Sequence, residues 1–214
     1  MSDFTDMITI MLNGGIISLK LFGIVAVLSA AIGIFVAIGK ISKITPLRVI
    51  LSFYTWIFRG TPLLLQLFFI YFGLPAVGIR LDPMTASVIA FTINYAAYLA
   101  EVFRSGIESI DKGQFEAAKV LGMTYSQTMI KIIIPQAARN VIPPVCNEST
   151  NLIKDTAMVA AIGVGDLLRG AKEVVMDNFT ITPFIAAGIV YLVIISVLIL
   201  IFKKLENKYV TSQL

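Results

Sequence analysis

The 214-residue sequence contains no histidine and a single cysteine, Cys146. The missing histidines exclude a histidine-ligated metal, a histidine general base and a histidine phosphocarrier. One cysteine allows no disulfide within the chain and no multi-cysteine zinc site. An intramembrane enzyme is therefore disfavoured, because the usual nucleophile–base pairs are nearly absent.

Charged residues are also scarce. They make up 14% of the chain, whereas a soluble domain carries about 25%. Hydrophobic residues reach 57% and the mean hydropathy is +0.89, so much of the surface must face lipid. The segment 1–13 has two acidic and no basic residues, and the apolar run after it is too long for a signal-peptide core. We therefore expect no cleavable signal peptide.

A phosphate-binding loop of the form G-x-x-x-x-G-K-[ST] is missing as well. Gly163 and Gly165 are not followed by the required Lys–Ser/Thr pair. The chain is therefore expected to hold no cofactor of its own. If it uses ATP and Mg²⁺, a partner ATPase must bind them.

What the sequence does contain is a set of long apolar segments. A spanning helix needs about 20 residues, and helices are the only option because no alternating barrel pattern is present. We predict an all-α polytopic membrane protein with about five transmembrane helices in one domain, 1–214, the fourth helix being bent or split by prolines. The segments are Ile16–Ile38, Val49–Leu74, Met84–Phe103, Met129–Ile162 and Ile185–Phe202.

The basic residues predict the orientation of these segments. Lysine and arginine concentrate in short loops on the cytoplasmic side of a membrane. The predicted N-terminus is therefore outside and the C-terminus cytoplasmic, although Arg169 and Lys172 fall in a connection that this topology places outside. The basic residues assigned to the cytoplasm are Lys40, Lys43, Arg48, Arg104, Lys112, Lys119, Lys131, Lys203, Lys204 and Lys208.

One cytoplasmic loop, 105–127, has the pattern of an ordered element. Asp111 is a candidate N-cap with Gln114 as its capping-box partner, and Gly122 sits where a glycine would end the helix. These signals predict a helix over Lys112–Leu121, roughly 15 Å long. Thr124 with Gln127 forms a second capping box, which would start the next span. The alternative is an amphipathic helix lying on the membrane interface.

The residues of this loop resemble a family motif. Glu116-Ala117-Ala118, Gly122 and Ile134-Pro135 are spaced as in the EAA motif of membrane subunits of binding-protein-dependent ABC importers. One departure is isoleucine where the family has leucine before the proline. The resemblance implies a coupling helix that docks on an ATPase subunit through Glu116, Ala117, Ala118 and Gly122.

Three further segments extend the resemblance over most of the chain and point to the polar amino-acid branch of these permeases. They are Phe58–Leu64, Asn94–Arg104 and Asn151–Thr156. The resemblance implies the type I fold, a bacterial plasma-membrane location, two permease subunits, two ATPase subunits and an extracytoplasmic binding protein. We expect the second permease subunit to be identical, although a paralogue stays open.

Polar side chains at membrane depth usually face protein or water. Asn94, Tyr98 and Glu101 share one helical face, so we expect them to line a substrate pathway. The alternative for Glu101 is a pair with Arg104 at the cytoplasmic interface.

Glu148, which follows Pro143-Pro144, is the second candidate for the pathway. Prolines remove backbone hydrogen bonds, so we expect non-helical backbone there that lines a cavity, the alternative being an exposed outer loop. Thr61 and Gln66 are further candidates, because Arg59-Gly60-Thr61-Pro62 interrupts the second segment and favours a kink.

The two carboxylates, Glu101 and Glu148, favour a cationic amino acid such as arginine, histidine or lysine. A carboxylate can equally hold the α-amino group of any amino acid, so glutamine, glutamate or another small solute remains an alternative. An ion-coupled secondary transporter is a further one, disfavoured because five spans without an internal repeat do not make the usual inverted-repeat core.

Overall fold

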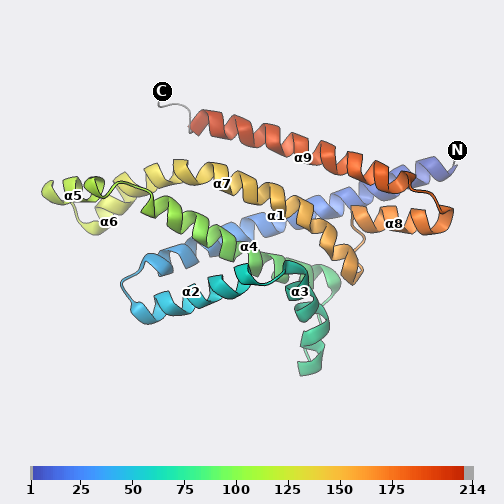
Figure 1. Cartoon of the computed structure of the whole chain (residues 1–214), viewed down its shortest axis with the longest axis horizontal. Helices are drawn as coiled ribbons and strands as arrows, with labels where there is room; N and C mark the ends of the chain where they lie inside the picture. Colours follow the sequence, from blue (N-terminus) through green and yellow to red (C-terminus); the bar gives the residue numbers. More distant parts are fainter. Residues whose placement is uncertain (1, 210–214) are drawn as a thin grey trace.

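The computed structural model describes residues 2–209, which form helices joined by short connections, without strands in this range. Three long helices run along the length of the molecule (Figure 1): α1 (Ser2–Ile41), α4 (Pro83–Glu108) and α9 (Thr182–Tyr209). Each is long and apolar enough to cross a membrane, α1 from Thr9 onward. The all-α membrane fold is therefore confirmed.

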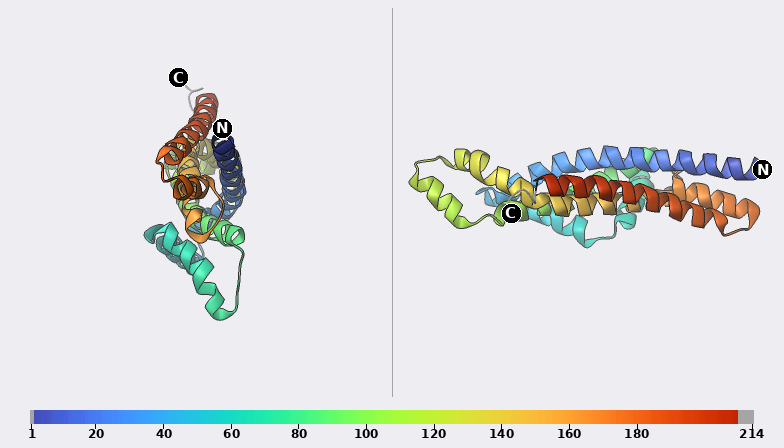
Figure 2. Two further views of the ribbon diagram at one scale, coloured as in Figure 1. Left: turned by 90° about the vertical axis from the view of Figure 1, so that its right-hand side faces the viewer. Right: turned by 90° about the horizontal axis from the view of Figure 1, so that it is seen from above.

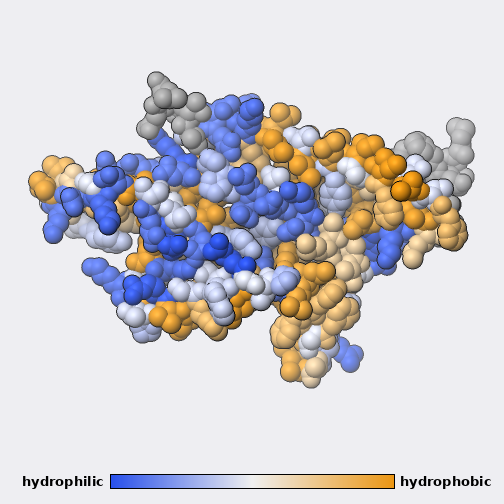
Figure 3. Space-filling view, viewed as in Figure 1, coloured by the Kyte–Doolittle hydropathy of each residue, from blue (hydrophilic) through white to orange (hydrophobic). Residues whose placement is uncertain are grey.

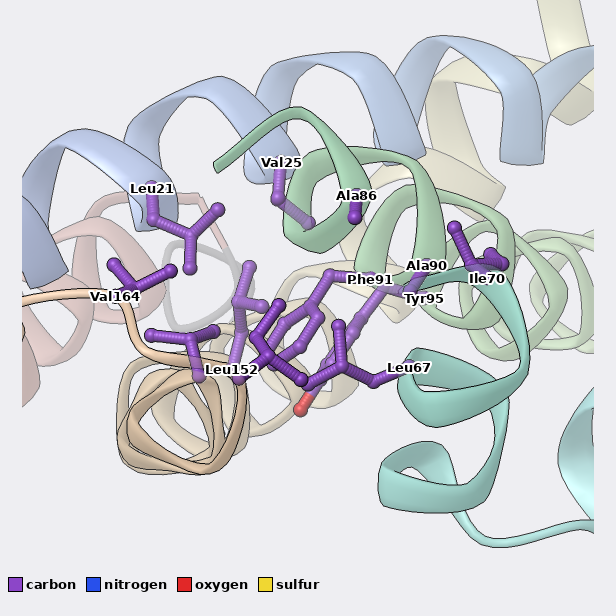
Figure 4. Packing of buried hydrophobic residues seen from close by; sticks show 12 residues of the cluster. Leu21, Val25, Leu67, Ile70, Ala86, Ala90, Phe91, Tyr95, Leu152 and Val164 are labelled. Atoms are coloured by element: carbon purple, nitrogen blue, oxygen red, sulfur yellow. The ribbon is translucent and has the colours of Figure 1, made fainter. Parts of the chain in front are cut away.

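The packing of α1 against α4 forms the centre of the molecule. A Cβ added at Gly33 of α1 would lie 3.0 Å from Leu99 Cβ of α4, so the two backbones approach as closely as small residues allow. Phe91 of α4 lies fully buried in the adjoining apolar cluster, with Leu21 and Val25 of α1 beside it (Figure 4). This body holds the polar side chains of α4 in fixed positions.

The second apolar segment is broken. Helix α2 (Thr45–Gly60) ends before Pro62, and α3 (Leu63–Phe68) with the π-helix η1 (Phe69–Gly73) and the 3₁₀-helix η2 (Leu74–Val77) leaves it at 104°. Thr61 is extended because the residue before a proline is driven from the helical region. The predicted interruption of the Val49–Leu74 segment is confirmed, and α3 projects from the body (Figure 1).

The proline-rich fourth segment is helical nearly throughout. Helix α5 (Lys112–Val120) leads through α6 (Tyr125–Thr128) and the π-helix η3 (Met129–Ile133) into α7 (Ile134–Asp155). The wider π turn lies where the ring of Pro135 would otherwise clash with the carbonyl four residues earlier. The expectation of non-helical backbone around Pro143-Pro144 is wrong, since α7 continues through both.

The last connection contains the 3₁₀-helix η4 (Thr156–Ile162) and helix α8 (Leu167–Asn178), which packs against α1 and α9. Arg169 and Lys172 therefore lie on a short helix at the end of the molecule opposite α5, as Figure 2 shows. On the face in Figure 3, hydrophobic side chains gather over α3 and the α8 end, and hydrophilic ones toward α5 and α6.

Candidate functional site

A buried amide network closes the break between α2 and α3. Asn94 Nδ2 donates to the carbonyl oxygen of Phe58 at 2.8 Å and to Gln66 Oε1 at 3.0 Å. Gln66 Nε2 donates in turn to the carbonyl of Phe58 and to the hydroxyl and carbonyl oxygens of Thr61. Asn94 and Gln66 are buried, so these two amides satisfy carbonyls freed by the broken helix rather than facing an open cavity.

Tyr98 lies one turn further along α4, in a different setting. Its hydroxyl donates to the carbonyl oxygen of Arg59 at 3.3 Å, and the Arg59 guanidinium stands 5.3 Å from the Tyr98 ring centre. Both side chains border an open groove of about 270 Å³ between α2, α4 and α7. Its lining residues are Arg59, Tyr98, Glu101, Val102, Arg104, Ser105 and Glu148.

Glu101 is held by three neighbours. It forms an ion pair with Lys40 of α1 and a second pair with Arg104 at 2.7 Å, and Thr55 Oγ1 lies 3.2 Å away. The pairing with Arg104 was expected as an alternative, whereas Lys40 and Thr55 were not foreseen. Two cations thus balance this carboxylate, which leaves little of its charge for a ligand.

Glu148 of α7 reaches the same groove from the other side. It is partly buried, and no hydrogen bond or ion pair ties its carboxylate among the described residues. Asp155 follows two turns later on α7 and accepts a hydrogen bond of 2.6 Å from the hydroxyl of Tyr95. Sequence reasoning did not single out Asp155, although it lies in the Asn151–Thr156 segment that resembles the family.

The chemistry of the groove is that of binding, since the arrangement contains no nucleophile–base pair. Among the side chains that the structure describes, those of residues 9–176 and 179–209, no group of three or more acidic or cysteine residues is placed to hold a metal ion. The groove offers the guanidinium of Arg59, the ring of Tyr98 and the carboxylate of Glu148, while Arg104 and Glu101 pair with each other at its edge. These groups suit a small zwitterion with a polar side chain.

Helix α5 is capped by hydrogen bonds at both ends. At its C-terminus Gly122 has φ +71°, and the amides of Gly122 and Met123 donate to the carbonyls of Lys119 and Ala118, both at 3.0 Å, which is a Schellman motif. The predicted Thr124–Gln127 capping box is present. Asp111 caps the N-terminus through the amide of Gly113.

Two local expectations for α5 need correction. Asp111 and Gln114 do not form the expected capping box. The backbone amide of Gln114 donates to the carbonyl oxygen of Asp111, but the Gln114 side chain does not complete the box. Ala118, expected at the docking contact, is 1% exposed within its own chain, so its side chain is covered rather than presented at the surface.

The exposed face of α5 carries the other predicted coupling residues. Glu116, Ala117 and Gly122 are exposed. Val120 and Leu121 next to them are 88% and 78% exposed, and sequence reasoning missed both. The signal was available, because two large apolar residues directly before a helix-ending glycine are costly to leave in water.

Comparison with known proteins agrees with this geometry. Residues 29–211 match the family model described as "Binding-protein-dependent transport system inner membrane component". The chain belongs to this family. The resemblance to permease subunits of the polar amino-acid branch is thereby confirmed, and such permeases are transport subunits rather than enzymes.

Individual relatives cover nearly the whole chain. An arginine transport system permease protein, ArtQ, of Bacillus subtilis is 41% identical, with 94% of this chain and 93% of the relative covered. A putative glutamine transport system permease protein, GlnP, of Rickettsia bellii is 38% identical, with 98% and 97% covered. These names attach different substrates to similar chains.

Solved structures give the same picture of the fold. One described as an amino acid ABC transporter with histidines superposes with a TM-score of 0.90 at 37% identity and covers 94% of both chains. The inward-facing MetNI methionine transporter has a TM-score of 0.81 at 19% identity, covering 95% of this chain and 97% of its own. The second likeness concerns the fold alone.

Proposed function

We propose that the chain is the membrane-spanning permease of an ATP-driven importer of polar, basic L-amino acids. Two identical copies form the pathway, two separate subunits bind ATP and Mg²⁺, and an extracytoplasmic binding protein delivers the substrate. The N-terminus lies outside and the C-terminus in the cytoplasm. The observation that carries the proposal is α5, a rigidly capped helix that presents Val120 and Leu121 bare to solvent at one end of the molecule.

Coupling through α5 follows from its construction. Exposed apolar side chains beside Glu116 and Ala117 form a surface that another protein would desolvate favourably. The Schellman motif and the Thr124–Gln127 box connect this surface to α7 without a flexible stretch. Movement of a docked ATPase would therefore reach α7, which carries Glu148.

The preference for basic substrates rests on the groove. Glu148 makes no hydrogen bond or ion pair there, although Arg59 across the groove acts on it electrostatically, and Glu101 is balanced by Lys40 and Arg104. A cationic side chain would give Glu148 the direct ion pair that it lacks. The alternative is a glutamine-type substrate whose α-amino group meets Glu148, as the GlnP relatives suggest.

The test is substrate-stimulated ATP hydrolysis and uptake by the reconstituted complex. Val120→Asp and Leu121→Asp should insert normally yet lose both activities, because a charge enters the apolar contact. Val77→Asp is the matched control, since Val77 is 72% exposed at the far side of the α2–α3 break. Full coupled activity of both α5 variants would refute docking through α5. Uptake driven by an ion gradient without the ATPase would instead support the secondary transporter.

A further inference from the structure

A basic cavity lies between the α1–α2 connection and the coupling helix. Its volume is about 580 Å³, and four elements build it: α1, α2, α4 and the α5–η3 segment. Its lining combines three basic side chains with apolar and aromatic ones, and Arg48 and Lys112 are exposed. The lining residues are Lys40, Ile41, Arg48, Ile107, Glu108, Ile110, Lys112, Phe115, Tyr125 and Met129.

Two of its cations have no acidic partner. Lys40 is engaged by Glu101, and Glu108 is engaged by Arg104. Arg48 and Lys112 form no ion pair with any described residue. The cavity therefore presents two free positive charges, and an anion is the complementary ligand.

An apolar groove of about 220 Å³ adjoins this cavity, and Ile107 lines both. On α1 the groove residues Ile34 and Ile38 precede Ile41 of the cavity on one helical face. On α4 the groove residue Phe103 lies one turn before Ile107, which lines both. The groove thus starts where the cavity ends and runs along α1 and α4 away from the α1–α2 connection. Its walls are Ile34, Ala37, Ile38, Phe103, Ile107, Ile134, Ala137, Ala138 and Val141.

We infer that this composite site binds one anionic glycerophospholipid, with the phosphate between Arg48 and Lys112 and an acyl chain in the groove between α1, α4 and α7. Basic pockets between transmembrane helices suit anionic headgroups. Phe115 and Tyr125 border the cavity, and aromatic side chains of this kind favour the region of lipid headgroups.

The combination of charges and groove selects a lipid over other anions. A free phosphate would contact Arg48 and Lys112 but leave the apolar groove empty. The lipid bridges α2 and α5, so its headgroup would help fix the coupling helix against the helical body. The leaflet is the one facing α5, which is cytoplasmic in the proposed orientation, while binding itself does not depend on that orientation.

The experiment is native mass spectrometry of the intact permease–ATPase complex in detergent with equimolar dioleoyl phosphatidylglycerol and phosphatidylcholine. Wild type should retain phosphatidylglycerol selectively. Arg48→Gln with Lys112→Gln should weaken its retention about 25-fold, at about fivefold for each cation. Lys43→Gln with Lys204→Gln, which removes two exposed cations outside the cavity, should leave retention unchanged. Equal loss in both double variants would overturn the site in favour of general surface attraction.

A second variant tests the groove. Ala138→Phe fills it and should reduce retention of phosphatidylglycerol while Arg48 and Lys112 remain. Soluble glycerophosphoglycerol should compete poorly, because it lacks acyl chains. Competition as strong as that of the lipid would overturn the acyl site. The same spectra report the number of permease copies in the complex. If Ala138→Phe changes this number but not the retention of lipid, protein and not lipid occupies the groove, and the acyl site is overturned.

Discussion

Lys40 of α1 and Glu101 of α4 form an ion pair inside the helical body, with side chains 9% and 13% exposed. The Lys40 ammonium also donates to Thr55 Oγ1 of α2 at 2.6 Å. One charge pair therefore joins three helices on the inner side of the polar groove. Because removal of one partner leaves the other charge poorly solvated, the pair restricts how α1, α2 and α4 can move relative to one another.

Glu101→Gln should lower the free energy of unfolding by about 3 kcal/mol, because it leaves the buried Lys40 ammonium with neutral partners only. Lys40→Met should cost less, since Arg104 still pairs with Glu101. The double variant should be less destabilised than the sum of the two single variants. Unfolding in detergent micelles measures all three, and strictly additive losses would contradict a direct pair.

Glu148→Gln should reduce uptake of basic amino acids about tenfold or more, because a charge-assisted contact with the substrate is lost. Basal ATP hydrolysis and assembly should persist, as the shape of the side chain is kept. Glu206→Gln, a carboxylate on α9 outside the groove, is the control. Unchanged uptake of arginine, lysine and histidine would remove Glu148 from the substrate pathway.

Gly14→Ala should destabilise the protein by about 1–3 kcal/mol, because an added Cβ would lie 2.7 Å from backbone atoms of Asp166 and Leu167. Helix α8 would have to shift away from α1. Gly23→Ala, on the same helix with nothing within 4 Å of its Cβ, should be neutral or slightly stabilising. Thermal unfolding of the two variants in parallel measures the difference, and equal midpoints would show that α8 yields without cost.

Asp166, fully buried in the α8 connection, caps α8 through the amides of Leu168 and Arg169. Burial raises the pKa of its carboxyl above the ordinary value. The folded state then holds this proton more tightly than the unfolded state, so the contribution to stability falls as pH rises from about 4 through the raised pKa. Asp166→Asn keeps a good helix N-cap and removes this pH-dependent contribution to stability. The thermal unfolding midpoint of Asp166→Asn should rise relative to that of wild type as the pH increases. Plots of midpoint against pH that run parallel for the two proteins would contradict a raised pKa at Asp166.

Features that depend on a few neighbouring residues were predictable from the sequence. Gly122 and the Thr124–Gln127 box fix the coupling loop locally, and Pro62 breaks the second segment through its effect on the preceding residue. The EAA spacing identified the family, because it joins residue types at fixed separations.

Features that depend on tertiary packing were not predictable. Lys40 and Glu101 are 61 positions apart, and nothing local brings them together. Burial of Ala118 depends on side chains around it that its own position in α5 does not reveal. The prolines of α7 suggested broken backbone, yet a helix persists there because in lipid the alternative is unpaired peptide groups.

The capping motifs between α5 and α6 also determine how stiff this connection is. An isolated helix of this length would fray, and a frayed segment absorbs a push by unwinding. Here the Schellman motif at Gly122 binds the last carbonyls of α5, and the Thr124–Gln127 box binds the first amides of α6, in directions fixed by hydrogen bonds. A force on Val120 is therefore transmitted through this rigid connection to α7. It tilts or translates α7 as a whole and does not unfold the connection locally.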